Sequence, residues 1–226
     1  MKRLFLGLLF LLGVLYGQSQ SFQIAVAKYR GGGDWYANLK TSLPNLIDFT
    51  NRELDLNIDP EQAIVEVGSP KIFEYPFVHM TGHGNIILNS QEANNLRSYM
   101  LGGGFLHIDD NYGMDPYIRR EIKKVFPEKE FVPLPASHPI YHQHFELSDG
   151  VPKVHEHDGK PPQAFGIFHE GRLVCYYTFE SDLGDGWENP TVHNDPPQVH
   201  REALKMGANI LQFAFLNITN DEQQEY

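Results

Sequence analysis

The stretch that decides the fold is GGGFLHIDDNYG (102–113), because it changes character halfway along. Its glycines are typical of a helix end, and the apolar run Phe105–Ile108 predicts a buried strand. Two carboxylates, Asp109 and Asp110, follow directly. Ligands of parallel α/β sheets bind at the carboxyl ends of the strands. This order therefore predicts a central strand that delivers carboxylates to a site.

Strand patterns and helix patterns alternate on both sides of this stretch. The predicted strands are short β-branched or aromatic runs: Phe22–Tyr29, Ala63–Val67, Phe77–Met80, Phe105–Ile108 and a hairpin over Ala164–Phe179. The predicted helices are one with Pro44 in its first turn, one capped by Ser90, one capped by Asp115 and a closing helix over Val199–Leu216. This alternation predicts an α/β domain with a mostly parallel central sheet.

Length and composition suit one domain. The chain has 226 residues and is 41% hydrophobic, so we expect a single domain over residues 20–217 and a polar tail over 218–226. Before the domain, two basic residues, a short apolar run over Leu4–Tyr16 and the small residues Gly17 and Ser19 predict a signal peptide over residues 1–19. We therefore expect an extracytoplasmic protein, periplasmic or secreted, with no membrane span after cleavage. An uncleaved N-terminal anchor is the alternative.

Charge and cysteine content exclude two classes of function. The net charge is −11, and loss of Lys2 and Arg3 with the signal peptide makes it −13. Such a chain offers no basic surface for phosphates, so nucleic acid is not an expected partner. Cys175 is the single cysteine, which excludes an internal disulfide, and its apolar neighbours predict a buried strand residue.

Four polar clusters follow predicted strands and are expected to meet at one edge of the sheet. Their candidate residues are Asp34 and Trp35; His83 and Asn85; Asp109, Asp110, Asn111 and Tyr112; and Asp182, Asp185 and Trp187. Each cluster has a plain structural alternative: Asp34 can shape a turn, His83 can be solvated, and one paired aspartate can bind backbone amides while the other faces water. Adjacent strand residues point to opposite faces, so at most one of these aspartates points into a given pocket.

Histidines raise the question of a metal cofactor. His155 and His157 share one side of an extended chain, but no established zinc spacing occurs, so solvated loop side chains are the simpler interpretation. His107 lies between apolar residues and is expected to be buried, paired to a carboxylate and able to orient Asp109. No Walker loop, dinucleotide fingerprint or G-x-S-x-G motif occurs, so no nucleotide cofactor is indicated.

Several separated segments carry a family resemblance. Over 75–113, 126–142 and 171–188, in the same order, the chain resembles the bacterial family of the domain of unknown function 4159, and the likeness extends over roughly 22–217. That family is similar to the class I glutamine amidotransferase-like and ThuA-like proteins. The resemblance implies a three-layer flavodoxin-like sandwich and leaves the activity unassigned.

The resemblance also bears on the chemistry of Asp109. In glutamine amidotransferases a glycine-led strand delivers a nucleophilic cysteine, and GGGFLHID (102–109) places Asp109 at that position. A carboxylate cannot form the thioester of glutaminase chemistry, so amidotransferase activity is not expected. Carboxylates can instead act as general bases or hold a metal-bound water.

Two functions remain open from the sequence. The first is an exported hydrolase, metal-assisted in one form, of a small polar or carbohydrate-like substrate. Its expected catalytic residues are Asp109, His83 and Asp110, and its expected metal ligands are His83, Asp109 and His138. Its expected ligand-binding residues are Asp34, Trp35, Asn85, Asn111, Tyr112, Asp182, Asp185 and Trp187. The second is a non-catalytic binding or assembly module on an amidotransferase-like scaffold.

Overall fold

A seven-stranded sheet forms the centre of the protein. The computed structural model describes residues 21–224, so the expected signal peptide over 1–19 lies outside the described residues. In sheet order the strands are β2 (Ala63–Glu66), β1 (Ala25–Lys28), β3 (Phe77–His83), β4 (Phe105–Tyr112), β7 (Arg172–Phe179), β6 (Gln163–His169) and β5 (Val132–Pro133). The first five pair in parallel, while β6 pairs antiparallel with both β7 and β5. The predicted α/β class with a mostly parallel sheet is confirmed.

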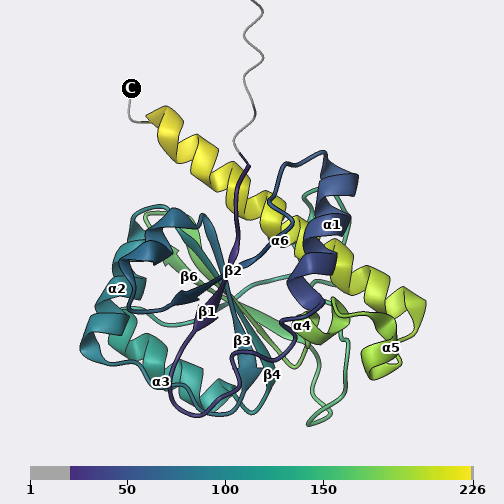
Figure 1. Ribbon diagram of the computed structural model, residues 1–226, viewed down its shortest axis with the longest axis horizontal. Coiled ribbons are helices and arrows are strands. Elements are labelled where there is room, and N and C mark those ends of the chain that lie inside the picture. Colours follow the sequence, from purple (N-terminus) through teal and green to yellow (C-terminus); the bar gives the residue numbers. More distant parts are fainter. Residues whose placement is uncertain (1–20, 225–226) are drawn as a thin grey trace, which may run out of the picture.

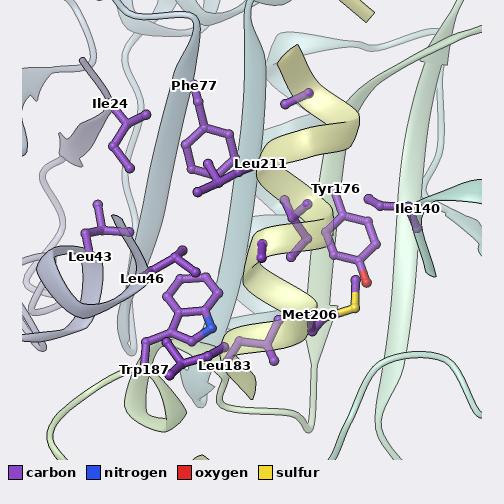
Figure 2. Close-up of a cluster of buried hydrophobic side chains, with 14 of the residues drawn as sticks. Ile24, Leu43, Leu46, Phe77, Ile140, Tyr176, Leu183, Trp187, Met206 and Leu211 are labelled. Atoms are coloured by element: carbon purple, nitrogen blue, oxygen red, sulfur yellow. The ribbon is translucent and has the colours of Figure 1, made fainter. Parts of the chain in front are cut away.

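Helices cover both faces of this sheet, and each face has its own apolar core (Figure 1). One face carries α2 (Ser90–Leu101) and α3 (Asp115–Val125), whose apolar side chains pack with Val78 and Ile108. The other carries α1 (Ser42–Leu54), α4 (Leu183–Gly186), α5 (Pro190–His193) and α6 (Pro197–Gln224). Figure 2 shows the core of this second face, where Trp187 packs among side chains of α1, α4 and α6.

Local sequence signals explain most helix boundaries, with two corrections. Pro44 lies in the first turn of α1, where its missing N–H needs no partner. Helix α2 is capped by Asn89 and not by Ser90: Asn89 and Glu92 form a reciprocal capping box. Helix α3 begins with Asp115 itself and follows Met114, so Asp115 is not the cap. Both predictions missed the cap by one residue.

Strand β4 is longer than its apolar run. It continues to Tyr112, because Asp109 pairs with both neighbouring strands and Asp110 and Tyr112 pair with β3. Asp109 is in register with Thr81 of β3 and with Thr178 of β7. The two aspartates therefore belong to the carboxyl-terminal end of a central strand and not to the loop that follows it.

The segment between α3 and β6 is ordered by contacts with α6. It contains β5 and the 3₁₀ helix η2 (Pro139–Tyr141), and Ile140 and Tyr141 are buried in the core beside α6. A second 3₁₀ helix, η1 (Pro70–Glu74), was not predicted, although Ser69 caps it and Pro70 begins it. Cys175 is buried in β7 as expected. In the described part of the chain, no helix is both long enough and apolar enough to cross a membrane.

Candidate functional site

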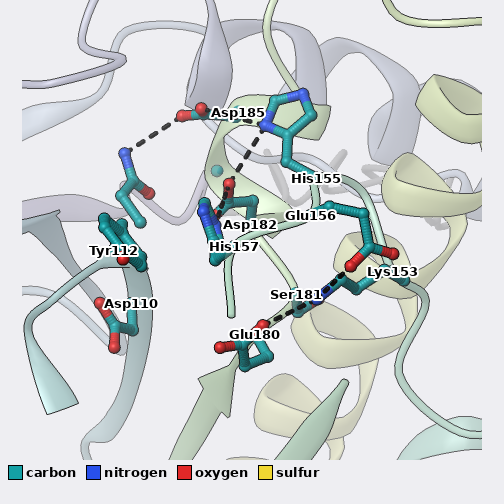
Figure 3. Close-up of polar contacts among 12 residues, drawn as sticks. Asp110, Tyr112, Lys153, His155, Glu156, His157, Glu180, Ser181, Asp182 and Asp185 are labelled. Atoms are coloured by element: carbon teal, nitrogen blue, oxygen red, sulfur yellow. Dashed lines mark hydrogen bonds and ion pairs between the residues drawn. The ribbon is translucent and has the colours of Figure 1, made fainter. Parts of the chain in front are cut away.

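Polar side chains from the end of β4, from the loop over residues 153–160, from the residues after β7 and from α4 gather in one region (Figure 3). Sheet pairing places the last residues of β4 between β3 and β7, and α4 begins four residues after β7 ends. The site is therefore assembled from segments that are far apart in sequence.

Asp109 holds α4 in place. Its side chain is fully buried, Gly184 N–H donates to Oδ2 over 2.7 Å, and the Thr178 hydroxyl donates to Oδ1 over 2.5 Å. Burial raises the pKa of Asp109 to about 7, and the hydrogen bond from Thr178 opposes that shift. A Cβ at Gly184 would lie 3.2 Å from Asp109 Oδ2, so the close approach of α4 favours glycine there.

Asp110 points to the other face of the sheet, as strand alternation predicts. Its two oxygens accept the backbone N–H groups of Met114 (2.8 Å) and Asp115 (3.0 Å), which anchors the start of α3. Burial raises the pKa of Asp110 to about 6, against the effect of these two hydrogen bonds. Asp110 also lines a cavity, described below.

The side chain of Asn111 connects β3 with α4 through hydrogen bonds. The Thr81 hydroxyl donates to its Oδ1 over 2.8 Å, and its own amide donates to Asp185 Oδ1 over 3.1 Å. Asn38 donates to the same Asp185 oxygen over 2.6 Å. One oxygen of Asp185 is thus held by two amides, while the other faces a group of histidines.

His155 lies among three carboxylates. Its Nδ1 lies 3.1 Å from Asp182 Oδ2 and 3.4 Å from Asp185 Oδ2, and its Nε2 lies 2.9 Å from Asp195 Oδ1. Hydrogen bonds with Asp182 and then Asp185 raise the pKa of His155 to about 11. His157 approaches the same Asp182 oxygen at 2.7 Å. The interpretation of His155 and His157 as solvated loop side chains was wrong, because both converge on a buried carboxylate.

His193 completes this group. Its Nε2 lies 2.9 Å from Glu188 Oε2 and 3.5 Å from Asp185 Oδ2. Burial favours a higher pKa for Asp185, but His155 and His193 together lower it below its usual range. Among the described residues, His155, Asp185 and His193 offer three metal-type donor atoms within 4.8 Å of one another. We call these three residues the loop cluster.

The other predicted site residues lie elsewhere. His83 pairs with Asp34, whose Oδ2 lies 3.1 Å from the imidazole Nδ1. His138 caps η2 and packs against Phe213. Asp109 contacts neither histidine in any hydrogen bond or ion pair of the described residues. The structure thus does not bring His83, Asp109 and His138 together.

Three residues that were predicted to bind a ligand make contacts within the fold instead. Trp187 is fully buried, and its indole N–H donates to the carbonyl of Ala203 over 2.8 Å, so it is a core residue and not part of a pocket wall. Asn85 accepts a hydrogen bond from Arg120 on α3. Trp35 packs between both apolar cores, edge-on to Tyr36.

His107 is buried as predicted, but its partner differs. Its Nδ1 lies 3.1 Å from Nδ1 of His79, and its Nε2 lies 3.2 Å from the Thr178 hydroxyl. The same hydroxyl contacts Asp109, so Thr178 lies between His107 and the carboxylate. We call His79 and His107 the core pair.

A cavity of about 220 Å³ opens beside the loop cluster. Tyr112 stacks on His157 with ring centroids 4.7 Å apart, and its hydroxyl donates to Asp158 over 3.1 Å. The lining residues are Asp110, Tyr112, Gly113, Asp115, Pro116, His157, Asp158, Lys160, Phe179 and Glu180. Asp182 joins this cavity to the loop cluster, since it contacts both His157 and His155 (Figure 3).

His193, Asp195, Glu188 and Asn38 had no predicted role in the site. The alternation of His155 and His157 was visible, but nothing in the sequence indicated that residues 182–195 would fold over it. Five carboxylates and one histidine within residues 180–195 were the available signal.

Fold and geometry define a class: an α/β domain with a mostly parallel sheet and a polar site at the carboxyl ends of its strands. A family model described as "Domain of unknown function (DUF4159)" matches residues 23–215. The chain belongs to this family. No curated protein matches the chain.

Proposed function

We propose that this protein is exported and binds a small polar, carbohydrate-like ligand in the cavity beside β4, and that it hydrolyses this ligand. The cavity itself is the observation that carries the proposal. It combines aromatic surface from Tyr112 and Phe179 with carboxylates from Asp110, Asp158 and Glu180. Aromatic faces and hydrogen-bond acceptors together suit a polyhydroxylated ring, and a space of about 220 Å³ suits a small one.

Asp110 is our candidate for proton transfer. Its carboxyl lines the cavity, and burial raises its pKa to about 6, close to the pH at which a group can both donate and accept protons. Each oxygen already accepts one backbone N–H, which leaves further acceptor capacity for a ligand hydroxyl. Asp109 has no such access, so we assign it a positioning role.

The strand order β2-β1-β3-β4 supports a flavodoxin-like, amidotransferase-like scaffold for this function. Glutaminase chemistry is not part of the proposal, because Asp109 stands where the related enzymes are expected to carry their cysteine. Export rests on the apolar run near the N-terminus.

A non-catalytic binding module is the second candidate. One observation favours it: both oxygens of Asp110 and both oxygens of Asp109 accept hydrogen bonds that hold helices α3 and α4. These structural roles explain why Asp109 and Asp110 occur side by side, without any catalytic reaction. Binding without turnover would be the signature of this alternative.

Ligand titrations separate these outcomes. The full chain is screened by NMR against glucose, N-acetylglucosamine and glucose 6-phosphate, and turnover is measured with nitrophenyl glycosides and nitrophenyl acetate. We expect binding of a neutral sugar, at least tenfold weaker in Tyr112→Ala and unchanged in Tyr36→Ala, an exposed tyrosine outside the cavity. Turnover that is lost in Asp110→Asn supports hydrolysis. Absence of binding, or equal binding by Tyr112→Ala, overturns the proposal.

A further inference from the structure

Two of the three spacings between donor atoms in the loop cluster match a metal coordination sphere, and all three donors lie within 4.8 Å of one another. Asp185 Oδ2 lies 3.4 Å from His155 Nδ1 and 3.5 Å from His193 Nε2. Neighbouring ligands of a tetrahedral ion with bonds of about 2.1 Å lie about 3.4 Å apart. We propose that His155, Asp185 and His193 bind a divalent metal ion of the zinc class and leave one coordination position open.

Outer contacts orient two of the three donors, Asp185 and His155. Asn38 and Asn111 hold Oδ1 of Asp185 and leave Oδ2 for the ion. Asp195 lies against Nε2 of His155, so the ligand atom is Nδ1, which faces Asp182 and Asp185. A carboxylate behind the second ring nitrogen is the usual support of a metal-binding histidine, since it fixes the tautomer and the ring orientation.

A neighbouring buried carboxylate lacks the partner that a cation would supply. Asp182 is 1% exposed, its Oδ1 has no hydrogen-bond partner, and its Oδ2 lies 3.1 Å from His155 Nδ1. Unpaired buried carboxylate oxygens are costly, and a divalent ion close by offsets that cost. This observation does not depend on the spacing of the three donors.

The local charge favours a cation as well. In the described part of the chain, the ion pairs of Asp182, Asp185, Glu188 and Asp195 involve histidines and no lysine or arginine. Four carboxylates thus face imidazoles, which bind a metal ion in their neutral form. The negative charge of these carboxylates favours a divalent cation at this position.

The donor types select the ion. Two imidazoles and one carboxylate suit zinc and similar transition metals, whereas calcium and magnesium prefer oxygen ligands alone. Three protein ligands with an open position are typical of catalytic rather than structural zinc sites. The metal site stands without the proposed hydrolysis, and Asp182 connects it to the cavity through His157.

Zinc titration of the chelator-treated full chain tests the inference. We expect one zinc per chain by calorimetry and a visible cobalt(II) spectrum at the same stoichiometry. Affinity should fall about 100-fold or more in His193→Ala and in Asp185→Asn, which keeps the shape of the side chain and its two amide contacts. His138→Ala, a partly buried histidine at η2, is the matched control and should bind like the parent chain.

Two results would overturn the site: no stoichiometric zinc, or equal affinity in the parent chain and in both ligand variants. Circular dichroism of His193→Ala checks that the variant is folded. Failure of the cavity proposal gives a different pattern, because Tyr112→Ala would then leave both sugar and zinc titrations unchanged. The two proposals are therefore separable in one set of variants.

Discussion

The core pair and the loop cluster contain histidine rings at the same separation, with centroids 5.0 Å apart in both cases. His79 and His107 lie in the sheet beneath Trp187, and burial lowers the pKa of His79 to about 3. His155 lies among carboxylates, and its pKa is raised to about 11. Ring spacing alone therefore does not define a metal site. Carboxylate neighbours and access from solvent make the difference.

The largest expected effect follows from breaking the core pair. His107→Ala removes a fully buried ring that packs beside Phe77 and Tyr176, and it leaves His79 Nδ1 without its partner. We expect a loss of about 3–4 kcal/mol in the free energy of unfolding, measured in urea. His193→Ala, on the partly exposed loop cluster, should cost less than about 1 kcal/mol. A change below about 1 kcal/mol in His107→Ala would contradict the packing argument.

The substitution Asp109→Asn tests how the buried carboxyl of Asp109 changes stability with pH. A carboxyl with a higher pKa in the folded chain binds more protons when folded, so its contribution lowers stability as pH rises from about 4 to about 7. A shift of about three pKa units corresponds to at most about 4 kcal/mol in the free energy of unfolding. The groups that face Asp109 are Thr178, His107 through Thr178, Asp182 and Asp185.

Asparagine can accept from Gly184 and donate to Thr178, so the fold should survive this change. Urea unfolding at pH 4.5, 6 and 7.5 should show that Asp109→Asn gains free energy of unfolding relative to the parent chain as pH rises. The core pair acts in the opposite sense: stability falls as pH drops from about 6.5 toward 3, because His79 is protonated only on unfolding. Identical profiles for both chains would contradict the burial of an ionisable Asp109.

The carboxylate of Asp195, which contacts Nε2 of His155, can be removed without changing a proposed metal ligand. Asp195→Asn keeps a side chain against Nε2 of His155 but removes its charge. We expect zinc affinity to fall about 10–100-fold, as for other carboxylates behind metal-binding histidines. Asp48→Asn, an exposed aspartate on α1, is the control for charge loss. Equal losses in both variants would mean a general electrostatic effect.

The smallest effect is expected at a third histidine–carboxylate contact. His83 and Asp34 are paired but partly exposed, and exposed pairs contribute little. His83→Ala should change the free energy of unfolding by less than about 0.5 kcal/mol and leave zinc affinity unchanged. A strong loss of zinc in this variant would relocate the metal site to the residues first expected from the sequence.

Strand and helix order could be read from the sequence because local signals decide it. The apolar run before Asp109, the proline in the first turn of α1 and the glycine at 171 in the β6–β7 hairpin all act within a few residues. The end of β4 could not be predicted, because pairing with β3 and β7 extends it past the apolar run.

The position of the site in the fold could be predicted, but the contacts that form it could not. The expectation that polar residues meet at the carboxyl ends of the strands holds for Asp109, Asn111 and Asp185. The loop cluster joins positions 155, 185 and 193, and its geometry depends on how Asp109 and Asn111 hold α4. No local pattern encodes contacts over such sequence separations.

X-ray absorption at the zinc edge identifies the ligands of the bound ion. For the zinc-loaded chain we expect two imidazole ligands and oxygen ligands at about 2.0–2.1 Å. The imidazole signal should fall to one ring in His193→Ala and remain at two rings in His107→Ala. A zinc shell without imidazole, or a shell that His193→Ala leaves intact, would contradict the assignment of the loop cluster as the metal site.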